Sequence, residues 1–193
     1  MDTATYILKQ VAPIFNKRGY IGATLSELTA VTGMTKGALY GNFLSKEDLA
    51  VKAFSYNLKI AIYPMFDLVA QQSDALDKLQ AVTDYHRGHY ERVEGMGGCP
   101  MLRVSSDTQH TNPLLFRKAQ RISQIFLSGL IDILDEGKQS GLLKSGLDSA
   151  NYAKVILSMI EGATSLAFTH KDRSFLPIAM DATDKLIEDQ MKV

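Results

Sequence analysis

Apolar residues recur at three- and four-residue steps along most of this chain, which is the period of an α-helix. The first stripe contains Ile7, Val11 and Phe15. Pro13 lies inside this stripe, so we expect it to kink that helix or to reset its start. The two-residue alternation of a β-strand is nowhere sustained. The pattern therefore predicts an all-α protein.

Local signals divide the rest of the chain into further helices. Ser45 and Asp48 have the spacing of a capping box and predict the start of a long helix, which we expect to bend at Pro64. A helix is expected over 74–92, and Pro113 opens a long amphipathic helix. The glycines between these two helices predict a break.

The segment 150–168 is apolar on most faces of its expected helix. A helix of this kind must be buried on more than one side. It could be enclosed by its own chain, but a two-fold dimer in which this helix and the last one pack against their copies is the more economical solution. Small residues such as Gly162 and Ser165 would permit close approach.

The most informative local signals lie between residues 24 and 49. Thr24 and Glu27 have the spacing of a capping box, and Gly33 supplies the positive φ that ends a short helix in a tight turn. Thr35 can cap the helix that follows. Two short helices joined by a glycine turn form the helix-turn-helix arrangement, which places its second helix in the DNA major groove.

These residues resemble the N-terminal domain of the tetracycline-repressor (TetR) family of bacterial transcriptional regulators. The positions that carry the resemblance are Thr24, Leu28, Gly33, Lys36, Gly37, Leu39, Tyr40, Phe43, Lys46, Glu47 and Leu49. The resemblance implies an N-terminal three-helix helix-turn-helix DNA-binding domain over residues 1–46 and a helical ligand-binding and dimerisation domain over residues 47–193. It also implies a homodimer interface formed by the 150–168 helix and the C-terminal helix.

The chain departs from the family pattern at three positions. Thr29 and Thr32 stand where small alanines are expected, and their hydroxyls can bond back to carbonyls four residues earlier without changing the fold. Asn42 stands where the family more often has His or Tyr, which affects the local DNA contacts.

Two kinds of DNA contact are expected in this region. The resemblance implies phosphate contacts by Thr24, Tyr40 and Lys46, and helix N-termini favour such anions. The candidates for reading bases are Lys36, Ala38 and Asn42, followed by Thr35. The alternative for Lys36 and Tyr40 is an ordinary solvated surface.

The resemblance further implies a pocket for a small-molecule inducer. Aromatic and methionine side chains suit an adaptable apolar cavity, although the same residues would serve equally as ordinary core. The candidate lining residues are Phe66, Tyr85, His89, Met101, Phe116, Phe126 and Met159. His86 and His89 have a spacing used by metal sites, but no further ligand completes one, so no metal or cofactor is expected.

Cys99 is the single cysteine and lies at the expected N-terminus of a helix that starts at Pro100. This position can lower a thiol pKa, which makes Cys99 a candidate redox sensor; the alternative is a buried, inert cysteine. One cysteine excludes an intrachain disulfide and a cysteine-rich zinc site, and it suits a reducing cytoplasm. We expect no signal peptide and no membrane span.

Composition reduces the number of candidate functions. The chain has 193 residues, 46% of them hydrophobic, with 21 basic and 21 acidic side chains. This balance argues against an architectural DNA-binding protein, because nonspecific affinity depends on neutralising phosphates. Paired carboxylates, a phosphate-binding loop and a zinc signature are absent from the sequence, which argues against an enzyme with a non-functional helix-turn-helix. The sequence therefore predicts a transcriptional regulator that binds a pseudo-palindromic operator as a homodimer and is released by a small molecule. Most regulators of this kind are repressors, and we expect the same here.

Overall fold

The computed structural model describes residues 2–193, which form eleven α-helices and one terminal π-helical turn. The all-α fold class is therefore confirmed. Two compact units can be distinguished. One comprises the chain up to Ile62 together with Val93–Arg121, and the other comprises Tyr63–Arg92 together with Ile122–Val193. These units are defined by packing alone, so the expected functional boundary between residues 46 and 47 stays a prediction.

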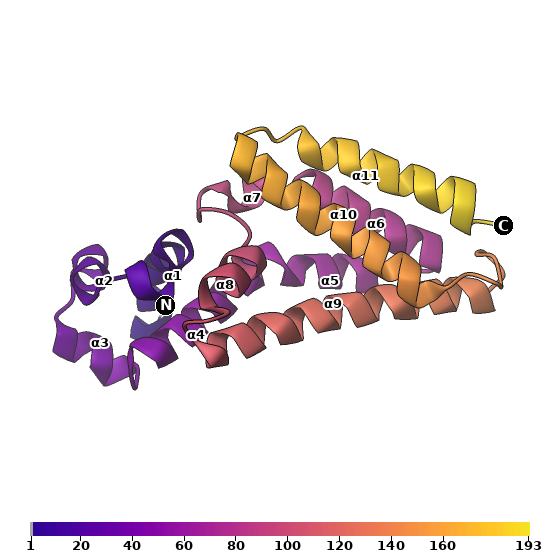
Figure 1. Ribbon diagram of the computed structural model, residues 1–193. Coiled ribbons are helices and arrows are strands. Elements are labelled where there is room, and N and C mark those ends of the chain that lie inside the picture. The colour runs from indigo at the N-terminus through magenta and orange to yellow at the C-terminus, as the bar shows by residue number, and fades with distance from the viewer. Residues whose placement is uncertain (1) are drawn as a thin grey trace. The chain divides into compact units, whose positions relative to one another are not determined.

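The first unit is built around the helix α1, which packs against α2, α4 and α8 (Figure 1). Ile7 and Val11 of α1 are buried. Asn57 Nδ2 on α4 donates a hydrogen bond to the carbonyl of Ala12 at 2.9 Å. Both polar and apolar contacts therefore hold α4 against α1. The elements of this unit are α1 (Thr3–Gly22), α2 (Leu25–Thr32), α3 (Lys36–Asn42), α4 (Lys46–Ala61), α8 (Pro100–Thr108) and the first turns of α9 (Pro113–Gln139).

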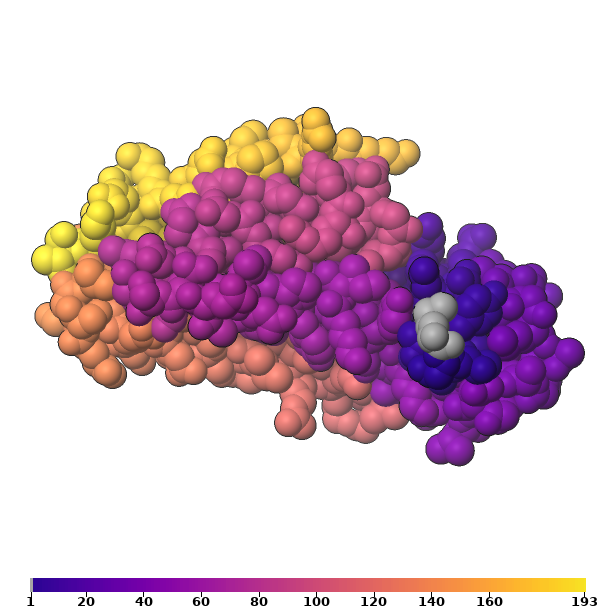
Figure 2. All heavy atoms as spheres, turned by 180° about the vertical axis from the view of Figure 1, so that it is seen from behind, coloured from indigo at the N-terminus to yellow at the C-terminus, as the bar shows by residue number. Residues whose placement is uncertain are grey.

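In the second unit α11 packs against both α10 and α6, and α5 packs against α6. Leu79, Ile156 and Met180 are buried in its core. Viewed from behind, α5 and α6 form the surface between α9 and α11 (Figure 2). This unit contains the rest of α9, together with α5 (Tyr63–Ala70), α6 (Ala75–Arg87), most of α7 (His89–Glu94), α10 (Ser149–His170), α11 (Phe175–Leu186) and η1 (Ile187–Met191).

Pro13 does not reset the start of the first helix. The helix begins at Thr3, where Asp2 accepts a hydrogen bond from the backbone N–H of Thr5, and it continues past Pro13. The non-helical residue inside α1 is Gly19, with a φ of 74°. The alternative of a new helix start at the proline was therefore wrong, and the kink lies at a glycine six residues later.

A bend was expected at Pro64, but the structure has a break between two helices, slightly earlier. α4 ends at Ala61, Ile62 has the non-helical angles φ −126° and ψ −47°, and α5 starts at Tyr63. The expected helix over 74–92 is likewise interrupted, at Gly88. Local capping signals placed the helix starts well, but these interruptions lie inside continuous apolar patterns.

The helix α10 covers the segment expected to be apolar on most faces. Ile156 and Ile160 are buried, but Val155 and Leu166 are 38% and 44% exposed. On α11, Ile178 is 66% exposed. The single chain therefore encloses only part of this apolar surface. Within residues 2–193, no helix combines the length and apolar character needed to cross a bilayer.

Candidate nucleic-acid interface and ligand cavities

The turn between α2 and α3 is held by the predicted caps. Thr24 Oγ1 accepts a hydrogen bond from the backbone N–H of Glu27 at 3.2 Å, and the Glu27 carboxylate accepts one from the backbone N–H of Thr24 at 3.4 Å. Gly33 has a φ of 66° and ends α2. Thr35 Oγ1 accepts from the backbone N–H of Ala38 at 3.2 Å, at the start of α3. The capping box, the glycine turn and the second cap are all confirmed.

The helix α3 presents a buried and an exposed face. Leu39 on α3 and Leu28 on α2 are completely buried, and Phe43 is 3% exposed, so these three side chains fix the two helices together. Lys36 and Ala38, two of the predicted base-reading residues, are exposed on the other face. This burial pattern leaves that face of α3 free to meet a ligand as large as DNA.

Hydrogen bonds within the two helices account for the residues that depart from the family pattern. The hydroxyls of Thr29 and Thr32 donate to the carbonyls of Leu25 and Leu28, at 3.0 and 2.7 Å, as predicted. Asn42 is exposed, and its Nδ2 donates to the carbonyl of Ala38 at 2.9 Å. Its amide oxygen and second N–H remain available at the surface.

Lys46 is more constrained than the sequence suggested. Its Nζ lies 4.9 Å from the centre of the Tyr20 ring and donates to the carbonyl of Ile21 at 3.5 Å. Burial lowers the pKa of Lys46, and the nearby carboxylate of Asp107 opposes that effect. Sequence reasoning missed Tyr20 because it lies on α1, 26 residues away. Tyr40, the third residue for which a phosphate contact is expected, is half-buried on α3.

The start of α4 is capped much as predicted. Ser45 Oγ accepts a hydrogen bond from the backbone N–H of Asp48 at 3.1 Å. The Asp48 carboxylate accepts from the backbone N–H of Leu44 at 3.0 Å, one residue before the position in an ideal capping box. Leu44 itself is 93% exposed. An apolar side chain so exposed beside α3 is a further candidate for a DNA contact that the sequence pattern did not identify.

Cys99 occupies the predicted position before α8 but is only 3% exposed. Its side chain makes no capping hydrogen bond to that helix. Thiols that react with oxidants are commonly low in pKa and partly accessible. Burial gives no support to a sensor, and the redox role of Cys99 stays a prediction.

The candidate ligand-binding residues are divided between the two units. Met101 and Phe116 lie in the first unit, on α8 and α9. The second unit contains Phe66 on α5, Tyr85 on α6, His89 on α7, Phe126 on α9 and Met159 on α10.

Phe126 is the centre of an aromatic cluster in the second unit. Its ring meets that of Phe66 edge-on, with centroids 6.1 Å apart, and stacks on that of His86 at 5.7 Å. His86 in turn lies 5.4 Å from His89 and 5.7 Å from Tyr85, between ring centroids. The structure therefore brings four of the predicted ligand residues into one cluster around His86.

Both histidines of this cluster are held neutral. Burial lowers the pKa of His86 to about 4 and that of His89 to about 3. His86 Nδ1 lies 2.8 Å from the carbonyl of Val82, whereas His89 Nδ1 is buried with no hydrogen-bond partner among the described residues. In residues 2–193, no group of three or more His, Cys, Asp or Glu side chains is arranged to hold a metal ion.

A cavity of about 290 Å³ adjoins this cluster between α5, α6 and α9. Phe66, Val82 and Phe126 line it, together with the charged residues Lys78 and Glu136. Tyr85 and His89 are not among its lining residues. Two of the seven predicted ligand residues thus face this space.

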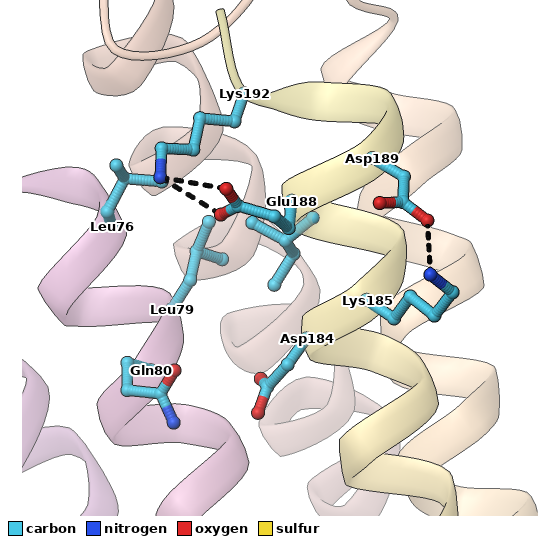
Figure 3. A pocket seen from close by; sticks show the side chains of 9 residues that line it. Leu76, Leu79, Gln80, Asp184, Lys185, Glu188, Asp189 and Lys192 are labelled. Atoms are coloured by element: carbon cyan, nitrogen blue, oxygen red, sulfur yellow. Dashed lines mark hydrogen bonds and ion pairs between the residues drawn. The ribbon is translucent and has the colours of Figure 1, made fainter.

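A second hollow of about 410 Å³ lies between α6 and the α11–η1 segment (Figure 3). The ion pair between Lys192 and Glu188 lies at one end of the hollow. At the other end, Asp184 on α11 faces Gln80 on α6. Asp184 Oδ2 accepts a hydrogen bond from Arg87. Leu76, Leu79 and Ile187 line this hollow together with charged and polar residues, and none of the predicted ligand residues borders it.

Comparisons with known proteins cover nearly the whole chain. The family described as "Bacterial regulatory proteins, tetR family" matches residues 7–53. The family described as "Tetracyclin repressor-like, C-terminal domain" matches residues 75–183, which is more than half of the chain. The first match includes all three helices of the candidate DNA-binding region.

Individual relatives give the same result. The chain is 25% identical over 194 residues to the uncharacterized HTH-type transcriptional regulator YxaF of Bacillus subtilis (strain 168), covering 96% of this chain and 95% of that protein. A TetR transcriptional regulator from Chloroflexus aurantiacus has 28% identity and a TM-score of 0.92, covering 99% of this chain and 96% of the other. A TetR-family regulator from Cytophaga hutchinsonii has 27% identity and a TM-score of 0.88, covering 99% and 95%.

Proposed function

This chain belongs to the TetR family of bacterial transcriptional regulators, and on that basis we propose that it binds a pseudo-palindromic operator as a homodimer, represses transcription there and is released by a small molecule. It is a DNA-binding regulator and not an enzyme. Binding to an operator, repression, the dimer interface, release by an inducer and a cytoplasmic location are all parts of this proposal.

The observation that carries the DNA-binding proposal is the pair of glycines in α3. A glycine inside a helix costs about 1 kcal/mol relative to alanine, so two in a seven-residue helix need a compensating role. Among residues 2–193, no atom lies within 4 Å of the position that a Cβ would take at Gly41. At Gly37 the nearest atom is Thr35 Oγ1, at 3.9 Å. Packing within the chain does not require either glycine.

Close approach of DNA to α3 would explain the two glycines. A recognition helix enters the major groove with its side chains at the base edges, and small residues let the two surfaces approach closely. Lys36 can donate to guanine, Ala38 can contact a thymine methyl, and Asn42 can pair with adenine. Their exposure supports these roles, with Thr35 as a further candidate.

Phosphate contacts would fix the register of this helix on the duplex. Thr24 is exposed at the N-terminus of α2, where backbone amides and the helix dipole favour an anion. Tyr40 supplies a hydroxyl from α3. Lys46 lies at the N-terminus of α4, and its contact with the Tyr20 ring would orient the ammonium group before DNA arrives.

The dimer proposal is supported by the uncovered surface of α10 and α11. Val155, Leu166 and Ile178 leave apolar surface exposed in the single chain. Gly162 lies on the exposed side of α10, and no described atom is within 4 Å of its missing Cβ. A second copy packed across a two-fold axis would bury this surface and make use of the glycine. Two recognition helices would then read half-sites about 34–36 Å apart.

Selection of bound sequences from random DNA tests the proposal. We expect a pseudo-palindromic consensus that binds with a steep salt dependence, and release of that duplex by one or more compounds in a small-molecule screen. A helical ligand-binding protein without DNA function would yield no consensus and no salt-dependent affinity. An architectural protein would bind every sequence alike and would ignore all compounds.

A further inference from the structure

The cavity between α5, α6 and α9 is apolar along its walls and charged only at three positions. Met65, Phe66 and Val82 are among its apolar lining residues, and Lys78, Asp132 and Glu136 are the charged residues that line the cavity. Its volume of about 290 Å³ lies at the lower end of the range for small-molecule sites. It would accommodate a short hydrocarbon chain or a single ring system.

Gly129 indicates that this space is kept open. It lies in the middle of α9 and lines the cavity, and among the described residues no atom is within 4 Å of the position that its Cβ would take. Glycine at that position lowers helix stability by about 1 kcal/mol relative to alanine. Neither a turn nor a close helix contact accounts for it, whereas an occupant of the cavity does.

The three charged side chains favour a particular kind of occupant. Lys78 Nζ donates to both carboxylate oxygens of Glu136, at 2.8 and 2.6 Å, so these two charges neutralise each other. Asp132 is exposed and forms no hydrogen bond or ion pair with any other residue that the structure describes. An anionic ligand would have to break the Lys78–Glu136 pair beside an unpaired carboxylate. A cation can pair with Asp132 and leave that ion pair intact.

We propose that this cavity binds an amphipathic monocation, with its hydrocarbon part against Phe66 and Phe126 and its amine beside Asp132. The inference rests on the proposed release by a small molecule and names the chemical class of that molecule. The apolar walls provide most of the affinity, and Asp132 provides the selectivity for charge.

Three eight-carbon probes that differ only in their head group test the charge selectivity. Octylamine is a cation at pH 7, octanol is neutral and octanoate is an anion. Isothermal titration calorimetry on the protein without DNA should give the tightest binding for octylamine, about fivefold tighter than octanol for one exposed ion pair, and the weakest for octanoate. Equal affinities for all three, or tighter binding of octanoate, would overturn the proposal.

Two substitutions locate the site. Asp132→Asn keeps the size of an exposed side chain, and it should reduce octylamine affinity to that of octanol without affecting octanol. Gly129→Leu places a side chain in the cavity, and it should abolish binding of octylamine and octanol while thermal unfolding shows a folded protein. Unchanged octylamine binding in either variant would disprove this placement.

A separate measurement distinguishes this inference from the proposed function. Operator release by octylamine is followed by fluorescence anisotropy, with Gly129→Leu as the control. Binding in the calorimeter without release would support the site and refute its role as the inducer pocket. Absence of any operator binding would refute the proposed function, whereas the calorimetric result would still decide the chemistry of the cavity.

Discussion

The carboxylate of Asp107 accepts a hydrogen bond from the backbone N–H of Tyr20, with Oδ2 and N separated by 2.7 Å. The residue before Tyr20 is Gly19, whose φ of 74° is the one non-helical feature inside α1. A Cβ on Gly19 would clash with the Asp107 carboxylate, so only glycine leaves room for this carboxylate at its present position. This contact joins α8 to the segment of chain that leads into α2.

Replacing Asp107 should weaken the first unit. Asp107→Ala removes a charged acceptor and leaves the Tyr20 N–H without its partner, which typically costs about 1.5–3 kcal/mol. Urea unfolding measured by circular dichroism gives the loss in free energy of unfolding. Asp107→Asn is the matched control, because its amide oxygen can still accept, and it should lose less. Equal losses in the two variants would show that the hydrogen bond is not the stabilising feature.

The positions of Asp107 and Tyr20 also show what the sequence could not predict. Thr24, Glu27 and Gly33 signal their turn within ten residues, because caps and left-handed glycines act locally. The Asp107–Tyr20 bond joins residues 87 positions apart, and no local pattern marks either partner.

The candidate DNA-binding residues could be predicted from the sequence, whereas the residues that line the cavity could not. Helical periodicity was sufficient to place Lys36 and Ala38 outward and Leu39 inward, because Leu39 lies on the face of α3 that packs against α2. Periodicity could not separate a cavity wall from ordinary core, since both are apolar on the inward face. Phe126 lines a cavity and Met101 lies in the other packing unit, although their sequence signals are equivalent.

Gly41→Ala should separate stability from DNA binding. An added methyl group meets no described atom within 4 Å, so alanine should raise the free energy of unfolding by up to about 1 kcal/mol. The same methyl group would stand between α3 and the DNA, and we expect operator affinity to fall at least severalfold. Thermal unfolding and fluorescence anisotropy on one preparation measure both effects. A stabilised variant with full affinity would remove Gly41 from the interface.

Lys46→Ala should weaken binding to all DNA sequences and reduce the salt dependence. Loss of one phosphate contact lowers the slope of log affinity against log salt concentration by about one unit. Lys59→Ala is a suitable control because Lys59 is an exposed lysine in the last turn of the same helix. The control should retain the parental slope. An unchanged slope in Lys46→Ala would exclude Lys46 from the phosphate contacts.

Gly162→Leu should dissociate the proposed dimer without unfolding the chain. The residue is exposed on α10 and has open space around its missing Cβ, so leucine fits the single chain but not a close two-fold contact. Sedimentation velocity should show a monomer at concentrations where the parent protein is a dimer. Gly162→Ala adds only one carbon and should have an intermediate effect. A leucine variant that stays dimeric would place the interface elsewhere.

Glu161 should make the protein less stable as the pH rises. Its Oε2 on α10 is buried without a hydrogen-bond partner among the described residues, and burial raises its pKa from 4.5 to about 7. Below pH 4.5 the group is protonated in both the folded and the unfolded chain. Between pH 4.5 and 7 the unfolded chain ionises first, so stability falls by up to about 3 kcal/mol and is then constant.

Glu161→Gln removes this dependence while keeping the shape of the side chain. The variant should therefore match the parent protein below pH 4.5 and exceed its free energy of unfolding increasingly up to pH 7. His86 and His89 have depressed pKa values, so they destabilise the fold as the pH falls below 6.5. They are present in both proteins, and their contribution cancels in the difference. Urea unfolding from pH 4.5 to 8.5 at one protein concentration measures this difference, and a difference independent of pH would contradict the assignment to Glu161.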